Sequence, residues 1–335
     1  MNDWMVDPGG LYFISLGEGV MKQVLPAAKT KRHGRLKKYF QMLFLLLFVS
    51  LFVATTGGNV FATEGGGGAY PNGAEDFMAG AVPPPGFYFL DYLTYYKADK
   101  FRDGSGGKLM PDFDLKVTAN VFRFLYVTKH QILGGFWGMQ VFLPVLNVDV
   151  RNPFGSQSKT GLGDIIVDPF ILSWHWKNFH LVTGLDIYIP TGEYDKNNLA
   201  NLGRNYWTFE PVIGATFISD GGFEVSGKFM YDFNTKNDDT EYKSGQEFHF
   251  DYTIAQKFGN WGVGLGGYYY KQTTADKLNG IKVGPDGFKG QVFAFGPQVK
   301  YDYKNMSFIL KYQTETSVKY RPEGDKFWFK FVYAF

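Results

Sequence analysis

The chain ends in the stretch Asp-Lys-Phe-Trp-Phe-Lys-Phe-Val-Tyr-Ala-Phe, residues 325–335. Side chains of a β-strand alternate between the two faces of a sheet, so every second residue shares a face. The odd positions of this stretch are all aromatic from 327 onward, and the even positions are mixed. The aromatic positions are Phe327, Phe329, Phe331, Tyr333 and Phe335. The stretch therefore predicts a long β-strand with one large apolar face.

The same period of two recurs along most of the chain, which predicts an all-β protein. About twelve such segments can be counted, with ten or fourteen as the alternatives. Short connections alternate with longer polar ones between them, which is typical of antiparallel strands. The predicted strands are 86–98, 112–127, 131–149, 161–176, 179–190, 204–218, 223–234, 244–258, 261–274, 288–302, 306–317 and 325–335.

An even number of long antiparallel strands with short turns on one side predicts a transmembrane β-barrel. Only helices and closed barrels satisfy their backbone hydrogen bonds inside lipid. The 22 Tyr and 7 Trp residues agree with this architecture, because both types collect at membrane interfaces. A secreted β-sandwich is the alternative, but its strands are usually only ~5–6 residues long. We therefore expect a barrel over residues 86–335 in a bacterial outer membrane.

Residues 1–62 have the features of an export leader. A basic run at 29–38 precedes an apolar run at 43–54, and Val60-Phe61-Ala62 fits a small-x-small cleavage site. We expect cleavage after Ala62, and Met21 as the true start of translation. An uncleaved transmembrane anchor is the alternative, because the uncharged stretch at 39–62 is long enough to span a bilayer.

Removal of this leader changes the charge balance. The whole chain has 34 basic and 32 acidic residues, and residues 1–62 hold seven of the former and three of the latter. The mature chain is therefore slightly acidic, which gives no support to nucleic-acid binding. The absence of Cys removes disulfide frameworks, thiol catalysis and Cys-ligated metal sites.

Residues 63–85 contain four consecutive glycines at 65–68 and three consecutive prolines at 83–85. Such a composition cannot form a long strand or helix. We expect either a periplasmic segment that leads into the first strand or a plug that folds into the barrel lumen.

Several motifs in the mature chain resemble one known family. They are Tyr70-Pro71-Asn72-Gly73, Pro83-Pro84-Pro85-Gly86-Phe87, Gly161-Leu162-Gly163-Asp164, Ile189-Pro190-Thr191-Gly192-Glu193 and Gly203-Arg204-Asn205-Tyr206-Trp207. The chain is similar here to the outer-membrane proteins assigned to the meta-pathway of phenol degradation. The resemblance covers nearly all of residues 64–335 and implies a transporter-like barrel associated with aromatic compounds.

The parity of the strands predicts which side chains line the lumen. Aromatic rings on the polar face would give a flat apolar solute a path, and a Tyr hydroxyl suits a phenol. Filling of space by these rings is the alternative. The predicted path comprises Phe87, Phe136, Phe142, Tyr188, Tyr206, Tyr268 and Tyr270.

A polar cluster is expected beside this path at Glu210, Glu247, His249 and Asp251. Its charges are expected to pair with one another or with lumen cations, because buried charges must be paired. A hydrolase that uses His249 with Glu247 and Asp251 is an alternative, although no nucleophile motif stands beside them. We expect no metal and no cofactor.

The function that fits these features is passive uptake of small hydrophobic compounds, aromatic ones in particular, through an outer-membrane channel of a Gram-negative bacterium. The expected partners are membrane lipid, the solute, and the barrel assembly machinery. The last would recognise the aromatic strand that ends at Phe335. A structural or partner-binding barrel is the other alternative.

Overall fold

The computed structural model describes residues 4–6, 12–16, 20–23 and 63–335, and the chain divides into two compact units, Met1–Asn59 and Val60–Phe335. In the first unit, three short antiparallel strands pair in the order β1-β2-β3. They are β1 (Trp4–Val6), β2 (Tyr12–Leu16) and β3 (Val20–Gln23). The predicted cleavage site and the apolar run before it lie outside the described residues. No helix among the described residues is long and apolar enough to cross a membrane.

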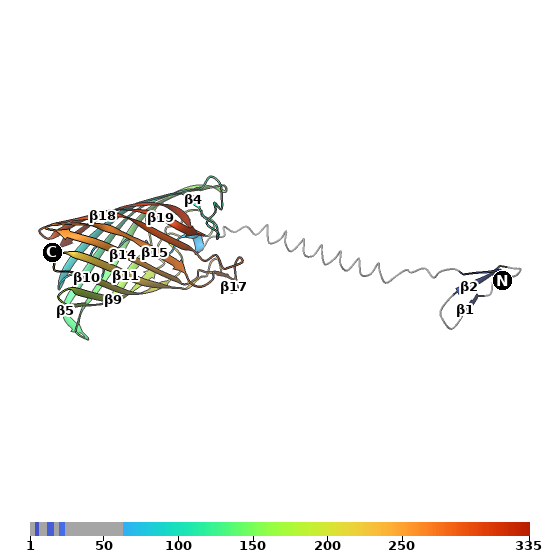
Figure 1. The fold of residues 1–335 in the computed structure, drawn as a ribbon, viewed down its shortest axis with the longest axis horizontal. Helices are drawn as coiled ribbons and strands as arrows, with labels where there is room; N and C mark the ends of the chain where they lie inside the picture. Colours follow the sequence, from blue (N-terminus) through green and yellow to red (C-terminus); the bar gives the residue numbers. More distant parts are fainter. Residues whose placement is uncertain (1–3, 7–11, 17–19, 24–62) are drawn as a thin grey trace. The chain divides into compact units, whose positions relative to one another are not determined.

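The second unit is a closed antiparallel barrel of twelve strands, as the sequence predicted (Figure 1). Each strand pairs with its neighbour in the chain, and the first and last strands close the sheet by pairing with each other. The strands are β4 (Gly86–Phe101), β5 (Asp114–Ile132), β6 (Gly135–Asn152), β8 (Ile165–His175), β9 (Phe179–Ile189), β10 (Thr208–Ile218), β11 (Phe223–Asn234), β14 (Glu247–Phe258), β15 (Trp261–Gln272), β18 (Gln291–Tyr303), β19 (Met306–Lys319) and β20 (Pro322–Ala334).

Alternation along each strand separates an apolar exterior from a polar interior. In β10, for example, Phe209, Ile213 and Phe217 are exposed, whereas Glu210 and Thr216 between them are fully buried. A closed sheet leaves no unpaired edge, and an exterior of exposed aromatic and aliphatic side chains matches lipid rather than water. The protein is thus built as an outer-membrane barrel.

The connections differ in length at the two ends of the barrel. Turns of two to four residues join strand pairs at the end where the C-terminus lies (Figure 1). At the opposite end five of the six connections have more than ten residues, and the sixth, between β19 and β20, has two. Because the long loops of such barrels face outward and the short turns face the periplasm, we call these ends the outer and periplasmic ends.

Two features of the outer end were not predicted. The strand β7 (Gly155–Leu162) extends the sheet beside β6, and a four-stranded sheet joins the two loops at 235–246 and 273–290. This sheet consists of β12 (Lys236–Asn237), β13 (Tyr242–Lys243), β16 (Lys277–Leu278) and β17 (Ile281–Lys282). All five strands are polar or very short, so they lack the apolar alternation that reveals a strand in the sequence.

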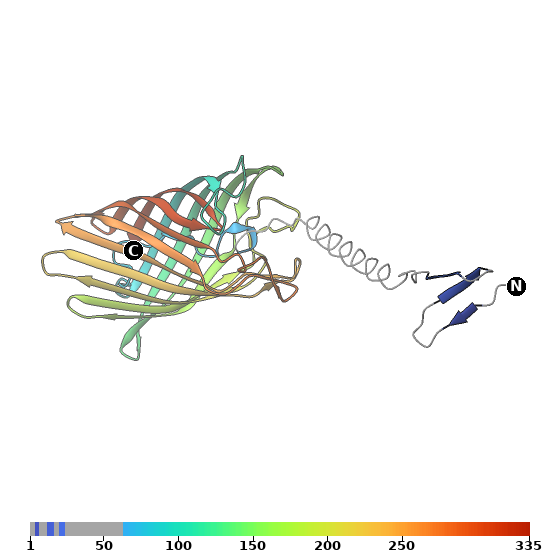
Figure 2. The ribbon, with the colours of Figure 1, turned by 45° about the vertical axis from the view of Figure 1, so that its right-hand side comes forward.

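Residues 63–85 run through the inside of the barrel. They begin with Thr63 and the short 3₁₀ helix η1 (Glu64–Gly66) among the loops of the outer end (Figure 2), where Glu64 bonds to Asn237 and Thr240, and continue to β4 at the periplasmic end. Thr63 and Glu64 bond to side chains of β14 and the outer loops. Gly80 donates to Thr216 of β10, closer to the other end.

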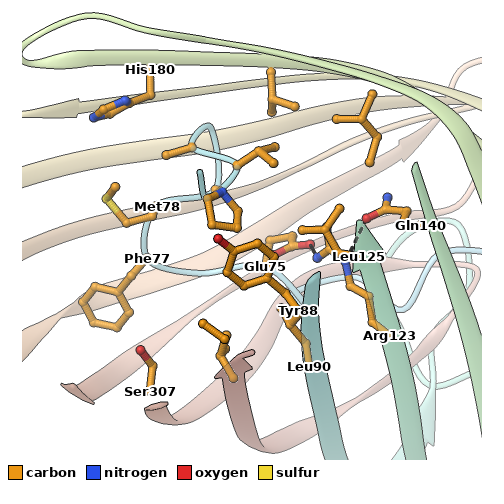
Figure 3. Close-up of a pocket in the computed structure, with 18 of the residues that line it drawn as sticks. Glu75, Phe77, Met78, Tyr88, Leu90, Arg123, Leu125, Gln140, His180 and Ser307 are labelled. Carbon is orange, nitrogen blue, oxygen red and sulfur yellow. Dashed lines mark hydrogen bonds and ion pairs between the residues drawn. The ribbon is translucent and has the colours of Figure 1, made fainter. Parts of the chain in front are cut away.

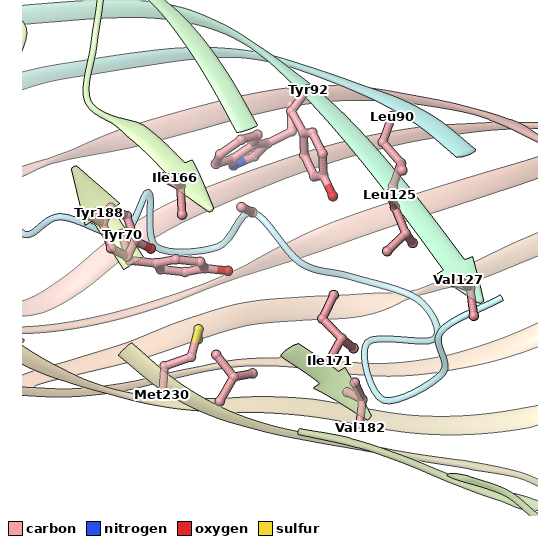
Figure 4. Close-up of a cluster of buried hydrophobic side chains, with 13 residues drawn as sticks. Tyr70, Leu90, Tyr92, Leu125, Val127, Ile166, Ile171, Val182, Tyr188 and Met230 are labelled. Carbon is pink, nitrogen blue, oxygen red and sulfur yellow. The ribbon is translucent and has the colours of Figure 1, made fainter. Parts of the chain in front are cut away.

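The buried apolar core of the barrel forms between this segment and the wall (Figure 4). Tyr70 and Ala74 of the segment belong to one cluster with inward side chains of seven strands. The wall contributes Leu90, Tyr92, Leu125, Val127, Ile166, Ile171, Val182, Tyr188, Val212, Met230 and Trp328. Residues 63–85 therefore pack into the lumen as part of the folded protein.

Candidate functional site: the barrel lumen

Six of the seven aromatic residues predicted to line the lumen have inward positions. Phe136 and Phe142 pack against the central apolar cluster, and Tyr206 is buried at the outer end of β10. Tyr188, Tyr268 and Tyr270 are at most 4% exposed. Their role in passage of a solute stays a prediction.

The prediction for Phe87 is wrong, because this side chain points outward. It is 40% exposed and packs on Phe124 and on the C-terminal Phe335, at ring-centroid distances of 6.3 and 5.2 Å. Phe87 shares its parity with the charged Asp91, which suggested that this parity faces the lumen. The inward face of β4 is apolar instead, because Leu90 and Tyr92 pack on the central cluster.

An acidic cluster with one histidine lies on the lumen wall near the outer end. The Nε2 atom of His249 lies 3.2 Å from Asp232 Oδ1 and 3.4 Å from Glu210 Oε2. Neighbouring strands bring these side chains together, since β14 pairs with β11 and β11 with β10. All three are buried, and the ring of Tyr70 stacks on His249 at 5.0 Å.

The same three residues could hold a metal ion. One ligand atom from each of Glu210, Asp232 and His249 lies within 4.8 Å of the others. Imidazole with carboxylates suits first-row divalent metals such as zinc or manganese. Ion pairing of a protonated His249 with both carboxylates accounts for the same distances, so the geometry by itself does not select a metal.

The two remaining members of the predicted polar cluster contact the inserted segment rather than His249. The hydroxyl of Thr63 donates to Glu247 Oε1 at 2.7 Å. Asp251 accepts bonds from the hydroxyl of Tyr70 at 2.6 Å and from the backbone N–H groups of Gly73 and Glu75, each at 2.9 Å. The two carboxylates thus bind the segment and are not arranged around His249 as the hydrolase alternative requires.

Lysine side chains of β19 and β20 bind the same segment. Lys311 Nζ donates to the carbonyls of Gly73 and Ala74 at 2.7 and 2.8 Å and lies 3.2 Å from Asp76. Lys330 Nζ lies 3.2 Å from another oxygen of Asp76. These charges are buried and paired, as buried charges must be.

Arg123 of β5 completes this set of contacts. Its guanidinium lies 3.1 Å from Glu75 and donates to the hydroxyl of Tyr92 at 2.7 Å. It also lies over the ring of Phe142, at 5.0 Å from the centroid. Charged side chains from several sides of the barrel therefore converge on residues 70–76.

A cavity of about 950 Å³ occupies the periplasmic part of the lumen (Figure 3). Its walls combine residues 75–85 with inward side chains of the strands, many of them apolar. Tyr88, Leu125, Phe136, Ile171, Val182 and Val332 are among the apolar lining residues. Its rim includes Asn305 and Ala334, so it reaches the periplasmic end. A cavity of this size and character is typical of sites for small apolar ligands.

Sequence reasoning missed two contributors to the site. Asp232 was not grouped with His249, although both have inward parity on paired strands and register alone would have brought them together. Tyr70 was assigned no role, because it lies in an irregular segment where periodicity predicts no direction.

The sequence matches one protein-family model, Phenol_MetA_deg, described as MetA-pathway of phenol degradation, over residues 98–331. No curated protein sequence is similar enough to count as a match.

Among solved structures, the crystal structure of the COG4313 outer membrane channel from Pseudomonas putida F1 superposes with a TM-score of 0.69. It is 15% identical in sequence, and the match covers 78% of this chain and 99% of that one. The CymD monoaromatic hydrocarbon channel matches with a TM-score of 0.38 and 9% identity, over 82% of this chain and 97% of that one. The first of these supports the barrel fold. The family model covers most of the barrel, so the chain belongs to the Phenol_MetA_deg family.

Proposed function

We propose that this protein is a passive outer-membrane channel for small hydrophobic compounds, aromatic ones in particular. The observation that carries the proposal is the apolar cavity of about 950 Å³ inside a closed barrel, open toward the periplasmic end. A barrel wall that is apolar on its outside and encloses a ligand-sized cavity fits transport better than adhesion. Membership of the Phenol_MetA_deg family, the similarity in fold to the COG4313 outer membrane channel and the aromatic side chains of the cavity support this proposal.

The aromatic preference has a physical basis in the cavity wall. Tyr88 and Phe136 offer ring faces on which a flat solute can stack, and Ile171 and Val182 exclude water from its edges. Arg123 and Gln140 lie at the inner end of the cavity and can bond a hydroxyl group (Figure 3). A few polar groups in an apolar pocket are the usual basis of ligand orientation.

We propose further that residues 63–85 act as a plug that controls passage. Their hydrogen bonds and ion pairs to β5, β14, β19 and β20 span the lumen between the cavity and the outer loops. A solute that enters from outside would have to pass this segment. Movement of the segment would then open the channel.

A comparison of uptake between a deletion strain and its parent would test the channel. Radiolabelled aromatic and aliphatic compounds of similar size should be offered at limiting concentration, and the deletion should slow entry of the aromatic ones. Val332→Asp, which adds a charge to the cavity wall, should reproduce this defect, whereas Val332→Ala should not. Equal uptake of every compound by both strains would contradict the proposal.

We also propose that the assembly machinery recognises the C-terminal strand. Phe335 is 75% exposed, and its ring packs only on the outward rings of Phe87 and Tyr333 among the aromatic residues described. Phe335→Ala should lower the amount of folded barrel in outer membranes several-fold, while the protein refolded from urea into detergent should be as stable as the parent. Normal membrane levels of the variant would refute this role.

A further inference from the structure

Two carboxylates lie buried without a basic partner where the inserted segment meets the outer end of the barrel. Asp276 and Glu247 are both 0% exposed. Across residues 63–335, no Lys, Arg or His nitrogen lies within 4.0 Å of either carboxylate. Arg321 attracts Glu247 from beyond ion-pair distance. No cation is among the groups that act most strongly on Asp276, and a buried charge without a countercharge is costly.

Asp276 instead accepts hydrogen bonds from four neutral donors. Its Oδ2 atom bonds to the hydroxyl of Tyr242 at 2.7 Å and to the backbone nitrogen of Thr63 at 2.9 Å. Its Oδ1 atom bonds to Gly245 N and Gln272 Nε2 at 2.6 and 2.7 Å. Burial raises the pKa of Asp276 to about 6, which reflects the missing countercharge.

Thr63 contacts both carboxylates. Its backbone nitrogen faces Asp276, and its hydroxyl donates to Glu247 Oε1 at 2.7 Å and lies 3.2 Å from the hydroxyl of Tyr270. Thr63 itself is fully buried. It is also the residue that follows the predicted cleavage site Val60-Phe61-Ala62.

Cleavage would change the chemistry of this nitrogen. Hydrolysis of the bond between Ala62 and Thr63 consumes one water, leaves a carboxylate on Ala62 and frees an amino group on Thr63. An α-amino group has an ordinary pKa of about 8, so it is largely protonated at neutral pH. The product is a cation at the nitrogen atom that already lies 2.9 Å from Asp276.

We propose that leader removal after Ala62 creates an α-ammonium group on Thr63 that pairs with Asp276 and Glu247 and fastens residues 63–85 in the lumen. The inserted segment is thereby locked only in the processed chain. This lock rests on the proposed plug role. Its test measures whether the segment stays bound to the wall, whereas the passage of a solute tests the plug.

The full chain, exported to the outer membrane and purified, supplies the first measurement. Its intact mass should correspond to a chain that begins at Thr63. A mature chain that begins at any other residue would overturn the inference, because the ammonium group would then lie elsewhere.

Thiol labelling supplies the second measurement, because the chain has no Cys of its own. Ala74→Cys places a reporter in the segment at a position only 7% exposed, so a maleimide reacts when the segment leaves the wall. Asp276→Asn keeps an oxygen acceptor for Thr63 but removes the charge. It should speed labelling about fivefold to tenfold, because hydrogen bonds to charged groups are stronger than neutral ones by roughly that factor in equilibrium constant. Asp286→Asn, on an exposed residue of the same loop, is the matched control.

A second variant removes the charge from the other partner. Insertion of Gly-Gly between Ala62 and Thr63 leaves the cleavage site intact but makes Thr63 N an uncharged amide again, with intact mass confirming where cleavage occurs. Labelling should accelerate as in Asp276→Asn, and the combined variant should be no faster than either alone. If both variants label at the parent rate, the ion pair does not exist. If labelling accelerates but solute leakage does not, the ion pair stands and the plug role fails.

Discussion

At the scale of single residues, Tyr70 joins the inserted segment to three side chains of the wall. Its hydroxyl donates to Asp251 at 2.6 Å, and its ring stacks on His249 and lies 5.1 Å below Lys228 Nζ. Tyr70→Phe should keep the ring contacts and lose one bond to a buried charge, worth about 1.5–3 kcal/mol. We expect labelling of Ala74→Cys to accelerate about tenfold or more. Tyr126→Phe, on the outer face, should leave the labelling rate unchanged. Equal labelling rates in the parent, Tyr70→Phe and Tyr126→Phe proteins would show that the Tyr70 hydroxyl does not hold the segment.

Asp276 gives the Gly-Gly insertion variant a predictable pH dependence. Its pKa is about 6 in the folded barrel and about 4 in an unfolded chain, so the folded state binds the proton more tightly. A raised carboxyl pKa means that retention of the segment is strongest below pH ~4 and weakens as pH rises through 6. The facing titratable groups are Tyr242, neutral throughout this range, and Glu247. Asp276→Asn in the same background should flatten the pH dependence of retention, and an unchanged pH dependence would show that Asp276 is not its source.

Residue-scale prediction from sequence was correct where one face of a strand is clearly polar. In β14, Glu247, His249 and Asp251 alternate with aromatic residues, and all three point inward. In β4 both faces are largely aromatic. Two charged residues on the outer face share the parity of Phe87, which led to the wrong prediction that Phe87 faces the lumen. The contacts of Tyr70 and Thr63 depend on the path of an irregular segment, and periodicity carries no information about such a path.

At the scale of elements, the inserted segment and the barrel wall should be separable. Backbone pairing among the twelve strands closes the sheet, and residues 63–85 take no part in this pairing, so the wall does not need them for it. Deletion of residues 64–82 would expose inward charged side chains such as Lys311 and Asp251 to water, which can solvate them. We expect the shortened barrel to reach the outer membrane and to leak small dyes and antibiotics. Permeability equal to that of the parent would contradict the plug role, and absence of the barrel from the membrane would contradict separability.

The elements themselves were predictable to within a few residues because each strand separates lipid from lumen. That separation imposes a strict period of two, which survives in the sequence from β4 to β20. The strands β7, β12, β13, β16 and β17 lie in the loops of the outer end and are polar or only two residues long. They lack the apolar alternation of the wall strands, so only the three-dimensional pairing of the loops shows them.

At the scale of the whole molecule, closure of the sheet should make unfolding cooperative and slow. The β4–β20 pairing leaves no free edge at which denaturation can begin. The protein in detergent should therefore migrate faster on a gel before boiling than after it, since the folded barrel stays compact in SDS. Asp286→Asn should behave as the parent does. Identical migration of boiled and unboiled samples would argue against a closed barrel.

The path of residues 63–85 has a consequence for the topology of the chain. Twelve strands, an even number, would by themselves return both ends to the periplasm. The inserted segment adds one more passage, because Thr63 contacts the outer loops while Gly86 begins β4 at the periplasmic end. The chain from Thr63 to Phe335 therefore runs between the two ends of the barrel thirteen times, with Thr63 buried at the outer end and Phe335 at the periplasmic end. A peptide attached to Phe335 would lie in the periplasm, on the opposite side of the membrane from the end of the barrel that holds Thr63.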